Sequence, residues 1–532
     1  MSKTFWTIIS LILALSALSL IMYSGEPEVV TEPVPEEISN RITELLTFVD
    51  EMGMTFDKMN EVTALAAAAG NTTNGRNWFG EAEDLFAALV SDFNSKVTPL
   101  NNRLSNSDLT ESSEKQIGEF MARARGYISN EKYKNLLVTK NSAGFRVNAN
   151  DWLRLARMYQ NVSDSYDRNM GLKTLAKILE SINVGIADDV YDMVDSPFVT
   201  ALYKAENPGS VDFASLTEGI TDPYLKLQIL IKYGRNQLND NVINALSGLL
   251  NEVEDNIEKG YFAARILVQL PGITDSQRGP FFTAIGNVDN LLMAETKLTL
   301  AENGGAEGAI RTAYINDVNA LLPGIEQNYP RERLHARLVM LNMNDEPDAI
   351  LEELEEIESI TLKDAALLYI ATHMEYNIEG KLNTLVDAMH DNYSKLAAKL
   401  HRFNRGDMDQ AQAEAFLLTL EGYIEHISET QPKIDLTLAW GKVNPVIAKQ
   451  KMVGFGTSDK VYMASALAEI LNDNTQISVL LNDVYAELSP SRIFEPIEKS
   501  QLLRVLSDAV KAYDSRFAAR LLEEGYSLVM GQ

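Results

Sequence analysis

Histidine, the side chain most often used near neutral pH for proton transfer and zinc binding, is rare in this chain. The five histidines are His335, His373, His390, His401 and His426. None forms an H-x-x-H or H-E-x-x-H pair, the spacing that places two zinc ligands on one helix face. His390 and His401 are three helical turns apart, too far to bind one ion together. We therefore expect no metal site.

Nucleophilic and phosphate-binding motifs are also missing from the sequence. The chain has no cysteine, which excludes disulfides, thiolate metal sites and cysteine nucleophiles. It contains no G-x-S-x-G or Walker A motif, and no G-x-G-x-x-G that follows a strand. The stretch most like a phosphate-binding loop is Gly454–Asp459, GFGTSD. No strand precedes it, so we interpret it as a capped loop between helices. The sequence thus predicts no catalytic residues, no cofactor and no enzyme.

Carboxylates gather most densely between Asp345 and Glu358, where the chain carries eight acids and no base. On a helix, the apolar stripe would be formed by Ile350, Leu351, Leu354 and Ile357, which leaves the glutamates largely in solvent. Three interpretations remain open: a solvated face, a docking surface for a basic partner, and a divalent-cation site. No calcium-loop pattern supports the third. The candidate docking surface consists of Glu352, Glu353, Glu355 and Glu356.

The overall composition excludes some functions and leaves others open. The net charge is −28 and the pI about 4.6, so the chain lacks the basic surface that nucleic-acid binding requires. Apolar residues make up 45% and charged residues 23%, as in folded proteins. A length of 532 residues exceeds what one hydrophobic core supports, about 250–300 residues. The acidity favours partners with basic surfaces.

The N-terminal segment predicts a membrane anchor. Residues 5–23 carry no charge and, as a helix, would span about 28 Å, the thickness of the hydrocarbon core of a bilayer. The alternatives are a cleaved secretory signal, whose cleavage pattern Ala17-Leu18-Ser19 nearly fits, and a buried core helix. Aromatic side chains bracket the segment, which favours the anchor. Its representative residues are Phe5, Trp6, Leu11, Leu15, Leu20 and Tyr23.

The charges around the anchor predict its orientation. Lys3 lies before it, whereas five glutamates lie between Gly25 and Glu37. Positive charge stays on the cytoplasmic side, so residues 1–4 form a cytoplasmic tip of a single-pass inner-membrane protein. The rest would be periplasmic or extracellular. Residues 24–37 contain three prolines among the glutamates and predict an extended spacer.

Residues 38–144 predict long amphipathic helices. The first carries a heptad stripe, the apolar residues of which step by three and four: Ile38, Ile42, Leu45, Val49, Met52, Phe56 and Met59. Two interpretations fit this stripe. It is buried inside an antiparallel bundle of one chain, or it forms a coiled-coil stalk that joins copies through residues 38–66.

From about residue 145 to 532 the pattern changes to shorter helices separated by turns. Turn signals recur, as at Asn207-Pro-Gly and Leu270-Pro-Gly, and Asp222-Pro223 is a good helix start. Helix after helix with short connections is the pattern of an α-solenoid. The expected fold is therefore all-α: a transmembrane helix, a long-helix bundle or stalk, and a solenoid of helix hairpins.

One unit of this region resembles a tetratricopeptide repeat. Trp152, Leu155, Ala156 and Tyr159 have the W-x2-L-G-x2-Y spacing of the first helix of that repeat, with alanine for glycine. Gly171, Leu175 and Ile178 resemble the small and apolar positions of its second helix, after a loop about three residues too long. A weaker match to the same spacing is formed by Leu362, Ala365, Ala366 and Tyr369. No regular period runs along the chain. The whole resembles a divergent tetratricopeptide-type or HEAT-like solenoid.

The resemblance implies a function in protein binding. Similar membrane-anchored proteins serve envelope assemblies such as secretion, pilus or flagellar machines. We therefore expect a periplasmic scaffold or adaptor with other envelope proteins as partners. The alternative is an extracytoplasmic helical-toroid enzyme that acts on polysaccharide or peptidoglycan. With four tryptophans in the chain, a sugar-binding groove is not favoured.

Overall fold

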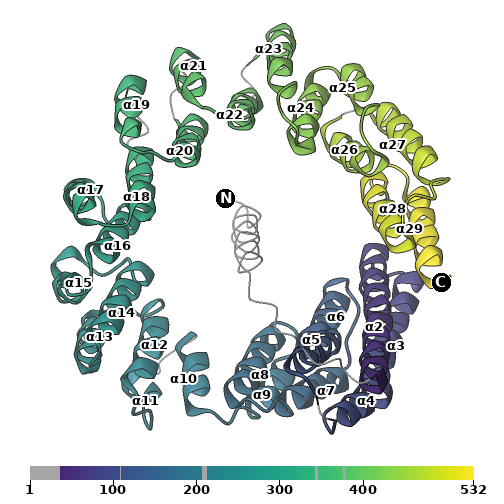
Figure 1. The fold of residues 1–532 in the computed structure, drawn as a ribbon, viewed down its shortest axis with the longest axis horizontal. Coiled ribbons are helices and arrows are strands. Elements are labelled where there is room, and N and C mark those ends of the chain that lie inside the picture. The colour runs from purple at the N-terminus through teal and green to yellow at the C-terminus, as the bar shows by residue number, and fades with distance from the viewer. Residues whose placement is uncertain are drawn as a thin grey trace. The chain divides into compact units, whose positions relative to one another are not determined.

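The computed structural model describes residues 36–107, 109–206, 212–341, 346–374, 379–405, 408–471 and 473–531. Every regular element in these ranges is helical (Figure 1), so the all-α prediction is confirmed. Within the same ranges, no helix combines the length and the apolar character that crossing a membrane requires. The predicted anchor, with Phe5, Trp6, Leu11, Leu15, Leu20 and Tyr23, lies outside the described residues.

The contacts divide the chain into two compact units. Unit 1 comprises the chain up to Phe56 together with residues 85–129, and unit 2 comprises residues 57–84 and 130–532. The long helices α2 (Glu36–Ala69) and α3 (Thr73–Asp92) contribute to both units. Residues 57–84 and 130–144, which the sequence assigns to the bundle, thus pack in unit 2.

Unit 1 contains the first part of α2, the end of α3, a π-helical turn (Phe93–Val97), α4 (Thr98–Leu104) and α5 (Glu111–Tyr127). Arg123 of α5 donates to Asp50 of α2 at 2.8 Å, and the rings of Phe56 and Tyr127 lie 5.1 Å apart. Gly53 has a packing reason here, because a Cβ at this position would lie 3.0 Å from the Tyr127 hydroxyl. The glycine thus lets Tyr127 approach the α2 backbone.

Unit 2 is a two-layered series of helix pairs. After α6 (Asn130–Ser142) and α7 (Ala149–Gln160), each even-numbered helix packs on the odd-numbered helix that follows it and on the next even-numbered helix. This is the α-solenoid arrangement, in which each unit contacts only its neighbours. The even-numbered layer consists of α8 (Ser165–Glu180), α10 (Pro197–Glu206), α12 (Pro223–Gly234), α14 (Asn256–Gln269), α16 (Asn290–Glu302), α18 (Asn328–Leu341), α20 (Ile360–His373), α22 (Asn392–Asn404), α24 (Thr430–Val443), α26 (Thr457–Ile470) and α28 (Pro496–Val510).

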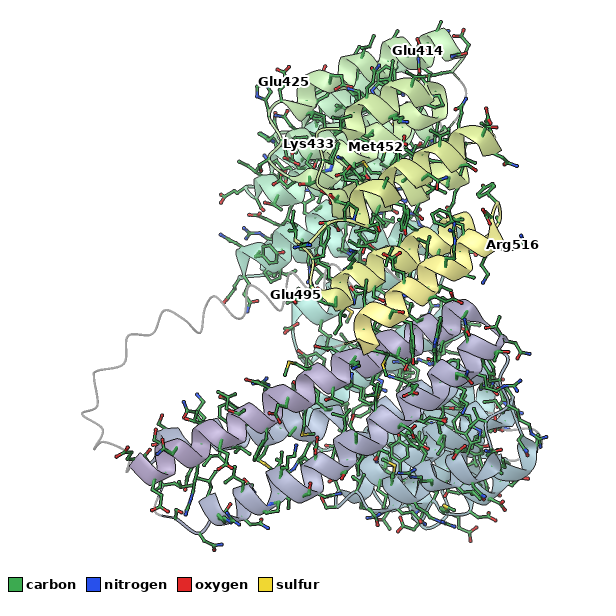
Figure 2. The ribbon with its side chains drawn as sticks, turned by 90° about the vertical axis from the view of Figure 1, so that its right-hand side faces the viewer. Glu414, Glu425, Lys433, Met452, Glu495 and Arg516 are labelled. Carbon is green, nitrogen blue, oxygen red and sulfur yellow. The ribbon has the colours of Figure 1, made fainter. Side chains whose placement is uncertain are left out.

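The odd-numbered layer is more variable in length. It consists of α9 (Val184–Tyr191), α11 (Phe213–Leu216), α13 (Asp240–Glu252), α15 (Gly279–Gly286), α17 (Gly308–Leu321), α19 (Pro347–Glu355), α21 (Glu379–Ala388), α23 (Gln410–Ile424), α25 (Pro445–Met452), α27 (Asn474–Leu488) and α29 (Ser515–Met530). Short 3-10 turns, Asp275–Gln277 and Leu322–Gly324, lie in two connections. Figure 2 follows the last pairs from the side, from Glu414 on α23 to Arg516 on α29.

Many of these helices begin with an acidic or amide cap. The Asp164 carboxylate accepts from the Asp167 backbone N–H at 2.8 Å at the start of α8, and Asp255, Asp289 and Asp391 cap α14, α16 and α22 in the same way. Such side chains satisfy N–H groups that a helix start leaves without partners. Part of the acidity of the chain therefore has a structural role.

Candidate functional site

The residues of the tetratricopeptide-like motif lie in the hairpin of α7 and α8. Trp152, Leu155, Ala156 and Tyr159 are all buried in α7. The Tyr159 ring lies against Gly171 of α8 so closely that a Cβ there would be 2.2 Å from its Cδ1. The Tyr159 hydroxyl donates to the Glu131 carboxylate at 2.6 Å. Burial and this hydrogen bond raise the pKa of Tyr159 far above its ordinary value, so its hydroxyl stays a donor.

The weaker match to the motif, in α20, packs differently from the motif in α7. Ala366 is fully buried, whereas Leu362 and Tyr369 are half-buried and Ala365 is exposed. Tyr369 stacks on His373 of its own helix, with ring centroids 4.1 Å apart. The buried face of α20 is instead formed by Asp364, Ala366, Leu367, Ile370 and Ala371. The shared spacing therefore does not give the same contacts in the two helices.

The heptad stripe of α2 is covered within a single chain. Leu45, Val49, Met52 and Met59 are almost completely buried, Ile38 is 9% exposed, and Ile42 and Phe56 are half-buried. A stripe that is already covered has little apolar surface left for another copy. This favours the bundle interpretation over the coiled-coil stalk.

The acidic stretch has the polarity that the sequence predicts. Ile350, Leu354 and Ile357 are buried, whereas Glu352, Glu355 and Glu356 are exposed and Glu353 is half-buried. Lys381 approaches the neighbouring Glu346 at 2.6 Å, and Glu356 lies 3.8 Å from His335. Its role as a docking surface stays a prediction.

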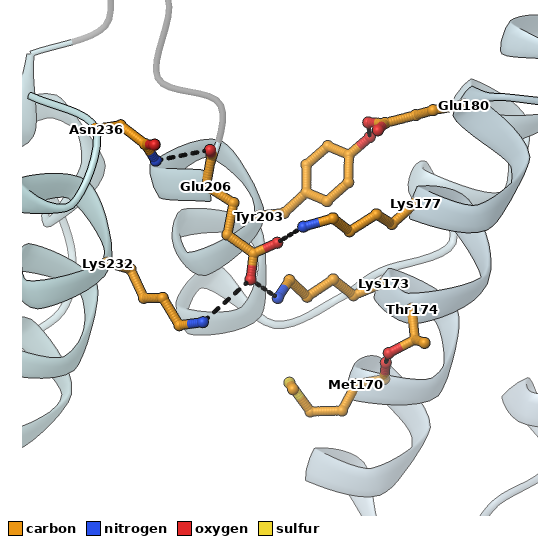
Figure 3. A network of polar contacts seen from close by, with 9 residues as sticks. All are labelled: Met170, Lys173, Thr174, Lys177, Glu180, Tyr203, Glu206, Lys232 and Asn236. Carbon is orange, nitrogen blue, oxygen red and sulfur yellow. Dashed lines mark hydrogen bonds and ion pairs between the residues drawn. The ribbon is translucent and has the colours of Figure 1, made fainter. Parts of the chain in front are cut away.

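The junction between α8, α10 and α12 is organised by one carboxylate. Glu206, the last residue of α10, accepts from Lys173 at 2.7 Å and Lys177 at 2.5 Å, both on α8 (Figure 3). Lys232 of α12 lies 3.7 Å away, and the Asn236 side chain donates to the Glu206 carbonyl at 2.9 Å. Three consecutive even-numbered helices thus meet at this residue.

The charges of this junction are strongly coupled. Lys173 and Glu206 are largely buried, with 9% and 14% of their side chains exposed. Burial opposes ionisation of Glu206, but the hydrogen bonds from Lys173 and Lys177 outweigh it and lower the pKa of Glu206 to about 2. The carboxylate is therefore ionised at any physiological pH. Both carboxylate oxygens of Glu206, Oε1 and Oε2, accept hydrogen bonds from lysines. Glu206 therefore connects neighbouring repeats and does not present a free carboxylate to a ligand.

Other junctions use buried polar side chains at the fifth residue of an even-numbered helix. Asn169 of α8 accepts from the Asp195 backbone N–H at 2.8 Å, and Glu332 of α18 accepts from Ser359 N–H at 3.0 Å. Asp364 of α20 accepts from the backbone N–H groups of His390 and Asp391, both at 2.9 Å. Each side chain binds the turn that leads into the next even-numbered helix. These helices therefore run parallel, with their N-termini along one edge.

Comparison of the helix starts reveals a short repeat that sequence reasoning missed. The fourth residue is basic in almost every even-numbered helix, although the helix dipole disfavours a cation in the first turn. A buried apolar residue often lies two positions before the cap. The basic residues are Arg168, Lys226, Lys259, Arg331, Lys363, Lys395, Lys433, Lys460 and Lys499, with Thr200 and Met293 as exceptions. The buried residues before the caps include Ile220, Val253, Ile357, Met389 and Ile427. This recurrence indicates copies of one unit.

Several of these basic side chains bind a neighbouring turn or helix. Arg168 lies 3.2 Å from Asp195 in the turn before α10. Lys460 lies 2.9 Å from Glu487 at the end of α27. Lys499 donates to the Ser489 carbonyl, in the turn before its own helix, at 2.6 Å. The pattern that could have revealed this repeat in the sequence is a helix cap followed four residues later by Lys or Arg. The pattern recurs at intervals of roughly the 34 residues typical of helix-pair repeats.

The two ends of unit 2 meet. Ser500 of α28 donates to Glu61 of α2 at 2.9 Å, and Trp78 of α3 stacks on Tyr526 of α29 with ring centroids 4.8 Å apart. At the other side of the 57–84 segment, Lys140 of α6 lies 2.5 Å from Glu83. Together with the helix pairs between α6 and α29, these contacts form a closed cycle within unit 2. We call the packing of residues 57–84 on α28 and α29 the closing contact.

A buried carboxylate lies at the centre of the closing contact. Glu61 is 3% exposed and Ser500 is fully buried. Arg504 approaches both Glu61 carboxylate oxygens, each at 3.5 Å. Burial raises the pKa of Glu61, and the Arg504 charge and the Ser500 hydrogen bond offset this only in part. Burial at this position therefore opposes ionisation of Glu61.

Neither the described side chains nor the comparisons with known proteins identify a reaction. In the described ranges, no three His, Asp or Glu side chains gather closely enough to hold a metal ion. No family model and no curated protein matches the chain.

Proposed function

We propose that the chain is a membrane-anchored, extracytoplasmic scaffold that binds protein partners through the edge formed by the starts of its even-numbered helices. The observation that carries this proposal is a row of exposed apolar side chains in the first turns of these helices. Four of them are between 54% and 62% exposed, Tyr166, Ile257, Tyr329 and Ile360, and Tyr393 is 42% exposed. Because first turns normally carry polar residues, a repeated aromatic or aliphatic residue there favours partner binding.

The arrangement of this row supports binding along several repeats. Adjacent packed helices are about 8–10 Å apart, so neighbouring members of the row suit a long partner segment better than a small ligand. Tyrosine is enriched at protein interfaces because it combines a rigid apolar ring with a hydroxyl. In this proposal the units are divergent tetratricopeptide-type repeats, and the partners are envelope proteins.

Site-specific photocrosslinking in intact cells tests the binding surface. A crosslinking amino acid replaces Tyr329 or Tyr393, and matched controls carry it at Leu418 on α23 or Val479 on α27, which are also exposed. We expect defined envelope proteins to crosslink at the first two positions and not at the controls. Equal products at all four positions, or a hydrolytic activity of the purified chain with no crosslinks, would contradict the proposal.

The anchor and its orientation need a separate measurement. The chain has no cysteine, so a single Ser527→Cys variant can be labelled selectively with a membrane-impermeant thiol reagent. We expect labelling of Ser527→Cys in cells whose outer membrane has been opened. Ser2→Cys should react only after the inner membrane is lysed. The reverse order would contradict the proposed topology.

A further inference from the structure

The closing contact differs from the junctions between α6 and α29 in how the chain connects it. At those junctions, successive helices are joined by short turns and cannot separate far. The bonded pair Ser500 and Glu61 is 439 residues apart in the sequence. Separation at this point therefore leaves every hairpin of unit 2 intact and breaks only non-covalent contacts.

The contacts that would break include the Trp78–Tyr526 ring stack, the central contacts of Glu61 with Ser500 and Arg504, and hydrogen bonds at the rim. At the rim, Asn74 donates to Glu523 at 2.9 Å and Lys511 donates to the Ala68 carbonyl at 3.2 Å. Beside them a cavity of about 250 Å³ separates parts of the two surfaces, with Trp78 and Leu522 among its lining residues. Exposed hydrogen bonds contribute little net stability, and the cavity lining has lost packing contacts.

At the centre, one buried carboxylate opposes closure when it is charged. Glu61 faces Ser500 and the charged Arg504 from α28, while Asp57 and Lys58 lie one turn earlier on its own helix. Other charged groups of the contact are Glu523 and Lys511, with the partners given above, and Glu81 of α3, which lies close enough to Tyr526 to act on it electrostatically. Closure takes the Glu61 carboxylate out of water, and the 3.5 Å approach of Arg504 compensates only partly.

We propose that the closing contact is a reversible gate, which holds unit 2 closed when Glu61 is neutral and opens more readily when Glu61 is ionised. This inference does not depend on the proposed scaffold function. The direction follows from the raised pKa of Glu61 in the closed state. Closure is fully stabilised below the ordinary glutamate pKa and loses stability as the pH rises through the raised value.

Distance measurements between paired spin labels test the gate in the full-length protein. The absence of native cysteine allows labels at Arg76→Cys and Ser527→Cys, two exposed positions on opposite sides of the closing contact. The matched control pair, Thr174→Cys and Lys204→Cys, spans the ordinary junction between α8 and α10. Electron–electron double resonance is recorded at about pH 5 and about pH 8.

We expect a second, longer distance for the gate pair, with a population that rises several-fold between these two pH values. The control pair should give one distance at both. Glu61→Gln, which stays neutral and still accepts from Ser500, should keep the short distance at both values. Arg504→Gln, which removes the compensating charge, should increase the long distance at the higher pH.

Two outcomes would overturn the proposal. A single short distance for the gate pair at both pH values, also with Arg504→Gln, would show that the contact does not open. A long distance that responds to pH equally in Glu61→Gln would show that Glu61 does not control it. Circular dichroism of each variant establishes that the helices remain folded.

Discussion

The junctions of unit 2 at Glu206 and at Glu61 are each organised by one carboxylate, and these two carboxylates behave in opposite ways. Glu206 lies between three lysines on neighbouring helices, and its pKa falls to about 2. Glu61 accepts a hydrogen bond from Ser500 at 2.9 Å and lies 3.5 Å from the Arg504 guanidinium, and burial raises the pKa of Glu61. A junction inside the series thus stabilises a charge, whereas the junction that closes the cycle disfavours one.

The difference follows from the number of partners that each carboxylate receives. A buried ion pair contributes stability only if close, well-oriented partners replace the lost hydration. Glu206 has hydrogen bonds of 2.7 and 2.5 Å from two cations, whereas the arginine contacts of Glu61 are longer. The first junction therefore becomes weaker without its charge, and the second becomes stronger.

The largest expected effect comes from removal of the carboxylate at the ordinary junction. Glu206→Ala leaves the ammonium group of Lys173, which is 9% exposed, without its carboxylate partner. Loss of one partner of a buried ion pair typically costs about 3–5 kcal/mol. We expect hydrogen exchange in α8, α10 and α12 to accelerate accordingly.

The matched control for that variant is Glu61→Ala at the closing contact. It removes a carboxylate whose ionised form is opposed by burial but leaves the buried Ser500 hydroxyl without its acceptor, so its cost should be about 1–2 kcal/mol at neutral pH. Faster exchange should be confined to α28, α29 and residues 57–84. Equal losses of protection in the two variants would remove the contrast between the junctions.

The next effect concerns two glycines that allow close helix approach. A Cβ at Gly171 would lie 2.2 Å from the buried Tyr159 ring, whereas at Gly525 it would lie 2.9 Å from the Ser500 hydroxyl, which could rotate only by weakening its hydrogen bond to Glu61. Overpacking costs about 1–3 kcal/mol, and alanine regains up to about 1 kcal/mol of helix propensity.

We therefore expect Gly171→Ala to lose about 2 kcal/mol and Gly525→Ala, which strains one hydrogen bond, about 1 kcal/mol or less, as measured by urea unfolding of each variant. The pair Gly171→Ala and Tyr159→Leu tests the cause, because the smaller side chain should restore part of the loss. If Gly525→Ala were the more damaging change, the closing contact would be the more tightly packed of the two.

The helical periodicity of the sequence predicts the all-α fold because each helix buries one face against its neighbours, as α7 does with Trp152, Leu155 and Tyr159. The first-turn basic residues, such as Lys226 and Lys259, were not recognised as a repeat, because two positions in about 34 give a weak signal until the helix starts are aligned. The closing contact was not predictable, since Glu61 and Ser500 are joined only by the accumulated geometry of all the intervening pairs.

The smallest expected effect is a difference in how the stability of the two junctions depends on pH. Glu206 has a lowered pKa, so its contribution is present above the ordinary glutamate pKa of about 4.3 and is lost only as the pH falls through about 2. Glu61 has a raised pKa, so its junction gains stability as the pH falls from neutral. Between about pH 7 and about pH 4.5 only the closing contact should respond.

Hydrogen exchange, corrected for the intrinsic pH dependence of amide exchange, measures this difference. We expect protection of α28 and residues 57–69 to rise a few-fold on acidification over that range, and protection of α8 and α10 to stay constant. In Glu61→Gln the rise should disappear, because the neutral amide already holds the closed state. A parallel rise in α8 and α10 would instead indicate a general response of the acidic surface to the loss of its repulsion, and the two carboxylates would then not account for the difference between the junctions.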